Sequence, residues 1–177
     1  NTSMSATTFP RPRAAEFAEY YGLYINRVPD GDILQHLHEQ KHAIAECLGQ
    51  VTADQAGVPH PPRTWTIKQV LGHMIDVEKI FGYRAHRFAV NDLRPILGMD
   101  QNVYVDGLNY HDVTLPELTE ELLLHRRANL AFLRRIPDKA WNYVGVADGN
   151  SLSVRAIAYC LVGHVTHHLE IIKERVA

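Results

Sequence analysis

The sequence predicts an all-α protein, a four-helix bundle. Four long segments repeat apolar residues every three or four positions, and each of these segments begins with a helix-capping signal. No segment alternates apolar and polar residues convincingly enough to indicate a half-buried strand. A length of 177 residues with 46% hydrophobic content suits one domain with a substantial core. We therefore expect a single domain over residues 1–177.

The first helix is expected over residues 33–50, after an irregular N-terminal arm at 1–22. Asp32 followed by Gln35 is a helix-start pattern. The apolar residues that follow keep helical spacing, namely Leu34, Leu37, Ile44 and Leu48. Residues 1–3 precede a methionine and are interpreted as a cloning scar.

The second helix has the clearest start. Thr66 and Gln69 form a capping box, in which each side chain bonds to the backbone amide of the other residue. Trp65 is placed to pack onto Val70 as a hydrophobic staple. The helix continues to about residue 90. Residues 91–115 contain prolines, glycines and aromatic residues without a period, which predicts a long connection of the kind that often carries function.

Two further helices complete the bundle. Thr114 and Glu117 form another capping box, and the helix that they start ends before Pro137. Residues 141–152 are rich in glycine, asparagine and aspartate, and they are predicted to form a loop. Ser153 caps the fourth helix, which runs nearly to residue 177.

Charge and composition exclude several classes of function. A formal net charge of −2 argues against nucleic-acid binding, which usually needs a strongly basic face. No apolar run approaches the roughly 18–20 residues that span a bilayer. Two cysteines build neither a disulfide framework nor a four-thiolate zinc site. We expect a cytoplasmic protein that binds neither nucleic acid nor membrane.

The unusual feature of the composition is its eleven histidines, and three of them interrupt apolar helix faces. On the fourth helix, His164 and His168 lie one turn apart in the inward row formed with Val154, Ile157, Leu161 and Ile171. His167 falls on the neighbouring row. On the second helix, His73 interrupts the row of Val70, Val77 and Ile80.

Helix register brings these histidines to one level of the bundle. His73 lies seven residues after Thr66, and His164 lies eleven after Ser153. The difference of one turn is about 6 Å along the axis, so one donor from each helix can meet if the helices face each other. His73 and His164 each follow a glycine, which costs about 1 kcal/mol inside a helix. We expect those glycines to allow close helix–helix approach beside the site.

Three converging imidazoles favour a divalent metal ion. Neutral imidazoles in a bundle core are costly unless a partner satisfies them, and a divalent cation does so directly. Three protein nitrogens with a fourth position open match a catalytic type of zinc site. Nickel and iron also accept imidazole ligands.

Alternative interpretations of the histidines stay open. A lone core histidine such as His73 more often forms an ordinary hydrogen bond, and helical pairs with this spacing also arise by chance. His38 and His42 have the same spacing on the first helix and are expected to be solvated. His125 is a candidate fourth ligand or supporting donor. Cys160 is a candidate soft ligand, although a small core residue is its commoner role.

Two segments resemble the DinB-like (damage-inducible) family of metal-binding four-helix bundles. They are Trp65–His73, which reads WTIKQVLGH, and Gly163–His168, which reads GHVTHH. Shorter matches lie between them, at Glu78, Tyr83-Arg84, Arg87-Phe88, the turn Gly98–Gln101 and Ser153–Ala156. The resemblance extends over most of the chain from about residue 23 onward.

The resemblance implies a bundle with up-down-down-up topology and a long connection between its second and third helices, often assembled as a homodimer. It also implies a divalent metal, zinc or nickel with iron or manganese as further options, held by residues that correspond to His73, His164 and His168. Similar proteins include bacillithiol- and mycothiol-dependent S-transferases and maleylpyruvate isomerase. Those activities belong to only some members, so the fold and site transfer better than the substrate.

The leading hypothesis is a metal-dependent enzyme on a small-molecule substrate. An S-transferase-like reaction of a low-molecular-weight thiol is the first expectation, with hydrolase or isomerase chemistry also open. One alternative is a metal-binding stress protein or sensor without turnover. Another is a structural bundle whose histidines only hydrogen-bond to one another.

Four residues are candidate catalytic residues. Arg84 and Arg87 are candidates to receive a substrate carboxylate, with a surface ion pair as the alternative. Asp100 and Tyr104 are candidates to order a water or a ligand histidine, although an aspartate in a glycine-rich turn is commonly a turn former. Asp76 and Glu78 are also considered as supporting groups, with a solvated helix face as the favoured interpretation.

Overall fold

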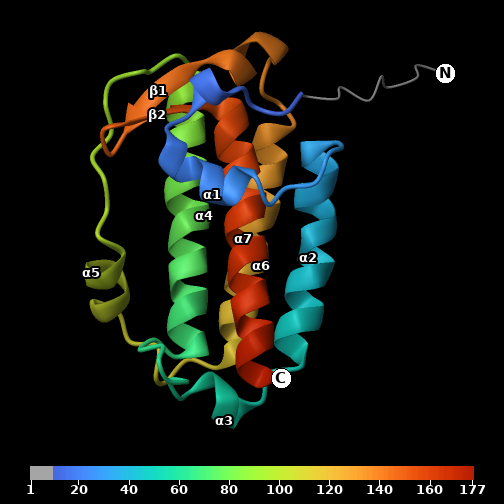
Figure 1. Ribbon diagram of the computed structural model, residues 1–177, viewed down its shortest axis with the longest axis vertical. Coiled ribbons are helices and arrows are strands. Elements are labelled where there is room, and N and C mark those ends of the chain that lie inside the picture. Colours follow the sequence, from blue (N-terminus) through green and yellow to red (C-terminus); the bar gives the residue numbers. More distant parts are fainter. Residues whose placement is uncertain (1–9) are drawn as a thin grey trace, which may run out of the picture.

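Four long helices form a bundle in the computed structural model, which describes residues 10–177. They are α2 (Ile33–Gly49), α4 (Ile67–Ala89), α6 (Leu115–Leu133) and α7 (Val154–Val176). Figure 1 shows α2 and α7 running in one direction and α4 and α6 in the other. This order is the up-down-down-up topology, so the predicted fold class is confirmed. A short helix, α3 (Ala53–Ala56), lies between α2 and α4.

The predicted helix starts are present. The capping boxes of α4 and α6 form, with Thr66 and Thr114 each accepting the backbone N–H three residues later. Asp32 and Ser153 accept a backbone N–H at the starts of α2 and α7. Gln35 does not bond back to the cap of α2, because its side chain donates along the helix instead.

The connection between α4 and α6 is long because these two helices are parallel. It must return the chain along the whole of α4, whose 23 residues rise by about 34 Å. Figure 1 shows it descending along the outer side of α4. The connection is only partly irregular, since it contains the six-residue helix α5 (Gln101–Asp106).

The prediction of a loop over residues 141–152 is wrong in part, because most of this segment folds into a β-hairpin. A short helix, η3 (Asp138–Asn142), leads into β1 (Val144–Ala147), which pairs antiparallel with β2 (Asn150–Ser153). Asp148 and Gly149 make the turn with positive φ angles. Strands of four residues are too short to show a clear alternation, so the expectation of no strand fails here.

The N-terminal arm is less irregular than expected. It contains two short 3₁₀ helices, η1 (Ala14–Glu16) and η2 (Glu19–Tyr21), followed by the single turn α1 (Gly22–Ile25). Buried Glu16 ties the arm down, since its carboxylate bonds to Ser153 and Arg155 at the start of α7. The expected scar at residues 1–3 lies outside the described residues.

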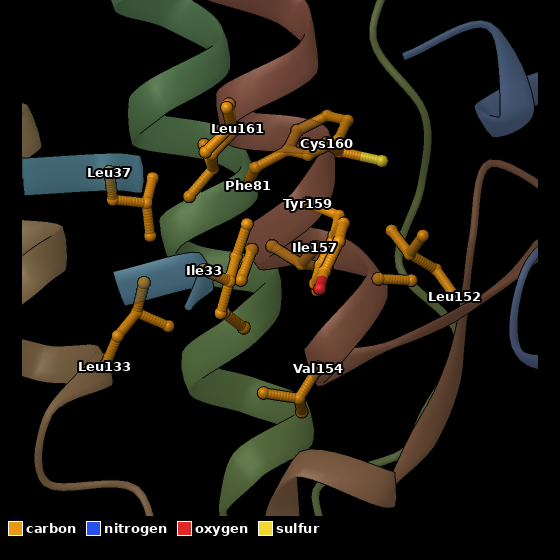
Figure 2. Close-up of a cluster of buried hydrophobic side chains, with 14 of the residues drawn as sticks. Ile33, Leu37, Phe81, Leu133, Leu152, Val154, Ile157, Tyr159, Cys160 and Leu161 are labelled. Atoms are coloured by element: carbon orange, nitrogen blue, oxygen red, sulfur yellow. The ribbon is translucent and has the colours of Figure 1, made fainter. Parts of the chain in front are cut away.

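The core consists of two apolar clusters stacked along the bundle. Figure 2 shows part of the cluster nearer the hairpin, in which Ile33, Leu37, Phe81, Leu133 and Ile157 meet. The second cluster surrounds α3 and the start of α4 and includes Ile44, Leu71, Leu122, Leu169 and Ile172. Gln40, Arg126 and His164 fall between the two sets on their helices, so a polar layer separates the clusters.

None of the helices within residues 10–177 has the length and apolar character needed to cross a membrane.

Gly163 allows α1 to approach α7 closely. A Cβ at this position would overlap the backbone carbonyl of Tyr24 in α1. The close approach expected beside His164 is therefore present, but its partner is the N-terminal turn and not another helix of the bundle. Because the obstacle is backbone, the contact leaves no flexible side chain to move aside.

We predict that Gly163→Ala destabilises the fold, because the new methyl group must displace α1. The free energy of unfolding should fall by about 1–3 kcal/mol in urea denaturation. The matched control is Gly49→Ala in α2, where an added Cβ meets nothing within 4 Å. That variant should gain up to about 1 kcal/mol from helix propensity. Equal effects of the two substitutions would contradict the packing role of Gly163.

Candidate metal centre

Three histidine side chains meet between α4 and α7. The Nε2 atom of His164 lies 2.9 Å from that of His73 and 3.1 Å from that of His168. The candidate ligand atoms all lie within 4.8 Å of one another. The structure thus brings together the three residues that the helix rows selected.

Hydrogen bonding alone does not satisfy this cluster. At Nε2 a neutral imidazole has either one lone pair or one N–H. His164 Nε2 contacts two other Nε2 atoms, so at most one of these contacts is a full hydrogen bond. A divalent cation instead accepts a lone pair from each ring. The donor set therefore fits a divalent metal ion.

The environment keeps the three rings neutral. Burial, with a further contribution from His167, lowers the pKa of His73 to about 4. Burial and the neighbouring His73 lower the pKa of His168 to about 3. Burial also holds the pKa of His164 well below its usual range. Neutral rings have the free lone pairs that metal coordination requires.

Aromatic side chains hold the rings in place. The ring centroid of Tyr24 lies 5.3 Å from that of His164, and the Trp65 centroid lies 5.4 Å from that of His73. The Nδ1 atoms of His73 and His164 are buried without a hydrogen-bond partner among residues 10–177. The orientation of these two rings is therefore set by packing. Metal-binding histidines are usually oriented instead by a hydrogen bond that their second ring nitrogen donates.

Gly72 also marks a close approach, but not the expected one between helices. A Cβ there would overlap the ring of Tyr110, which comes from the connection between α5 and α6. The long connection thus reaches the turn of α4 that carries His73.

A buried ion pair lies in the same polar layer. Arg126 on α6 is fully buried, and its Nε donates to Glu78 Oε1 on α4 at 3.0 Å. Its Nη1 donates to Gln40 Oε1 on α2 at 2.8 Å, and its Nη2 donates to the carbonyl of Leu161 on α7 at 3.2 Å. One guanidinium therefore bonds to the other three helices of the bundle.

The same network fixes the turn of α7 that carries His164. The Gln40 side-chain amide donates to the carbonyl of Val162 at 2.9 Å and to the hydroxyl of Thr166 at 3.0 Å. Asn129 donates to the second carboxylate oxygen of Glu78 at 2.8 Å. The network thus contacts α7 on both sides of His164, at the Leu161 and Val162 carbonyls before it and at the Thr166 hydroxyl after it.

The prediction that Glu78 and Asp76 lie on a solvated helix face is wrong. Glu78 is 1% exposed and Asp76 is 8% exposed. A sequence signal for this network existed, since Arg126 interrupts the row of Leu118, Leu122 and Leu130 on α6. Gln40 likewise falls between Leu37 and Ile44 on the buried face of α2. Both follow the rule that selected the histidines, a polar residue in an apolar row.

The four candidate catalytic residues lie elsewhere. Arg84 is buried with its guanidinium 4.8 Å from the centroid of the Phe81 ring, and it follows His73 by eleven residues, about 16 Å along α4. Arg87 pairs with Asp92 at 2.6 Å. Asp100 caps α5, and Tyr104 on α5 is 43% exposed. No contact described for residues 10–177 joins them to the histidines, so their catalytic roles stay predictions.

The other histidines and the cysteine of interest lie outside the three-histidine group. His125 is partly exposed, with its Nε2 3.9 Å from a carboxylate oxygen of Glu121. His167 flanks the site, its ring centroid 4.9 Å from that of His168. Cys160 is fully buried in the apolar cluster nearer the hairpin, and burial raises the pKa of its thiol.

A cavity of about 290 Å³ adjoins the site. His168 lines it, together with Trp65, Val70 and Ile171. Two arginines, Arg63 and Arg175, complete the polar part of its wall. No sequence pattern indicates either arginine. Arg63 lies in a loop without a period, and Arg175 is a basic residue in the last turn of a helix, where such residues are common.

Comparison with protein families decides the family. Residues 36–172 match the family model described as the DinB superfamily, which is most of the chain. The chain belongs to the DinB superfamily. This DinB-superfamily chain is also similar in structure to YfiT from Bacillus subtilis, described as a probable metal-dependent hydrolase with an unusual four-helix bundle topology. The TM-score is 0.73 over 87% of this chain and 95% of that chain, at 16% identity, which shows a shared fold. Comparison with curated proteins finds no match.

The buried ion pair gives a stability prediction for this DinB-superfamily bundle. Arg126→Leu leaves the Glu78 carboxylate buried without its cation, so the free energy of unfolding should fall by about 3–5 kcal/mol. The double variant Arg126→Leu/Glu78→Leu should recover much of this loss, because no buried charge remains. Both are measured by urea denaturation.

The matched control is Arg127→Leu, one residue along α6. Arg127 is exposed and pairs with Glu120 at 3.3 Å, so its loss should cost less than about 1 kcal/mol. A double variant as unstable as Arg126→Leu alone would contradict the charge argument.

The metal-free protein should lose stability as the pH falls from about 6.5 toward 4. Unfolded histidines titrate near pKa 6.5, whereas the buried rings titrate lower, so the unfolded chain binds more protons in this window. Each such histidine should contribute roughly 1.4 kcal/mol per pH unit there. Urea denaturation of the EDTA-treated protein across this range measures the slope. His73→Gln should reduce it, whereas the exposed control His42→Gln should not, and equal slopes would count against buried neutral rings.

Proposed function

We propose that this protein is a divalent-metal-dependent enzyme that acts on a small molecule at the His73–His164–His168 site. The observation that carries the proposal is the meeting of three neutral Nε2 atoms beside a cavity of about 290 Å³. Membership of the DinB superfamily supports it. The description of YfiT as a probable metal-dependent hydrolase also supports it.

The three histidines would hold the ion through Nε2, and three protein ligands leave a position open for a water or a substrate group. A divalent ion bound there supplies a Lewis acid that makes a water or a low-molecular-weight thiol a stronger nucleophile near neutral pH. Zinc suits this donor set, and nickel and iron also accept imidazole. The thiol would make the reaction an S-transfer, and water would make it a hydrolysis.

The remaining residues of the site bind, orient and exclude water. The rings of Tyr24 and Trp65 cover His164 and His73, which keeps bulk water from these faces of the cluster. A molecule bound in the cavity would contact His168, one of the three proposed ligands. Burial keeps each imidazole unprotonated at neutral pH, so none of the three is expected to act as a general acid while it holds a metal.

Metal analysis tests the site. Protein purified without nickel resin should contain close to one equivalent of a divalent metal, and His73→Ala should lose well over half of it. The matched control is His42→Ala, an exposed histidine on α2, which should keep full loading. The metal site would be refuted if the unmodified protein, after zinc is supplied, held less than about 0.2 equivalents of any metal.

Turnover is tested separately. Zinc-loaded protein is incubated with a panel of thiols and electrophiles, and with ester and amide substrates, and the products are followed by mass spectrometry. Product that depends on the protein, on zinc and on His73 supports an enzyme. A metal-loaded protein that is inactive on every member of the panel would favour a metal-binding protein without turnover.

A further inference from the structure

The cavity beside His168 is lined by both charged and apolar side chains. Arg63 and Arg175 are its two arginines, and Trp65, Val70 and Ile171 are most of its apolar residues. Its volume of about 290 Å³ is near the lower end of the range for small-molecule sites. The cavity therefore suits a small molecule that is charged at one end and apolar along its body.

Arg175 is a half-buried cation whose partners among the described residues are an imidazole and a backbone carbonyl. Its Nε and Nη2 donate to Nδ1 of His60 at 3.1 and 2.8 Å, and Nη2 also donates to the carbonyl of Trp65 at 2.8 Å. No carboxylate within residues 10–177 pairs with it, and its Nη1 has no hydrogen-bond partner there. The guanidinium is thus held in a fixed orientation with its charge uncompensated.

Arg63 adds a second positive charge to the same cavity. Its ion pair with Glu174, at 3.6 Å, joins side chains that are 41% and 72% exposed. Such exposed pairs contribute little to stability and exchange readily with other anions. Burial and the nearby charge of Arg63 lower the pKa of Arg175. The two cations therefore repel each other, and an anion bound between them would relieve this repulsion.

We infer that this cavity binds an organic carboxylate, with the anionic group held by Arg63 and Arg175. The planar fork of a guanidinium matches the two oxygens of a carboxylate, which gives both affinity and orientation. The apolar body would then pack on Trp65 and Ile171, in a cavity that His168 also lines. This inference rests on the proposed function, since it names the substrate class of the same site.

Paired ligands test the inference. Benzoate and benzamide have nearly the same size and shape but differ in charge. Each is titrated into the full-length protein, and binding is followed by the NMR signal of the Trp65 indole N–H and by calorimetry. Benzoate should bind at least about tenfold more tightly than benzamide, because charge-assisted hydrogen bonds are the stronger ones.

Arginine variants locate the effect. Arg63→Gln and Arg175→Gln should each weaken benzoate binding by about tenfold and leave benzamide binding nearly unchanged. The matched control is Lys173→Gln, which removes one positive charge from the exposed side of α7 without lining this cavity. If Arg175→Gln does not fold, as judged by circular dichroism, the result for Arg63→Gln tests the inference. The Arg63 side chain is 41% exposed, so its replacement is expected to leave the fold intact. Equal losses in Lys173→Gln, or equal affinity for the two ligands, would overturn the inference.

The titrations are run on both zinc-loaded and EDTA-treated protein, so that the two proposals fail separately. Benzoate that binds only the zinc-loaded protein, with no effect of the arginine substitutions, is a zinc ligand, and the carboxylate site is refuted. Benzoate binding by a protein that takes up no zinc would instead refute the proposed function and keep the carboxylate site. Inorganic phosphate that binds more tightly than benzoate, through the same arginines, would overturn the assignment to carboxylates.

Discussion

The buried guanidinium of Arg126 is the contact on which the rest of the structure depends. From α6 it bonds to Glu78 on α4, to Gln40 on α2 and to the carbonyl of Leu161 on α7. A charge in a bundle core costs several kcal/mol unless it is paired and its N–H groups are satisfied. Any rotation or sliding of one helix against the others would break one of these bonds. The network therefore sets the register in which α4 and α7 face each other, and with it the meeting of His73 and His164.

The position of this network explains how a polar site coexists with a well-packed core. Apolar clusters fill the bundle on either side, and the polar groups are confined to the layer between them. Gln40 extends the network to Val162 and Thr166, on the two sides of His164. The site thus lies on helices that are braced from several directions, and such bracing holds metal ligands in place. Two of the histidine rings have no hydrogen bond at Nδ1 from any residue that the structure describes, so this bracing and the aromatic contacts replace the usual supporting partner.

The sequence predicts those features that depend on local chemistry or on a helical period. The caps of all four long helices and the rows that hold His73, His164 and His168 are of this kind. The hairpin at 144–153 was not predicted, because strands of only four residues show no clear alternation of apolar and polar residues. Arg126 and Gln40 obey the rule that identified the histidines, yet arginine and glutamine are common on helix surfaces, so the same pattern is less informative for them. Arg63 and Arg175 meet only through the fold, and no periodicity brings a loop residue to the end of a helix 112 residues later.

This division between helices and loops has a consequence for function in the superfamily. The three histidines lie on helices whose register is fixed by the core, and the fold is shared with YfiT at 16% identity. Half of the residues that line the cavity, 62–65, come instead from the loop before α4, and loops vary more freely in sequence than the helices that they connect. A bundle of this kind can therefore keep the arrangement of its helix-borne histidines while the loops beside them vary. In this chain Trp65 belongs to both parts, because its ring contacts His73 and also lines the cavity that His168 lines directly.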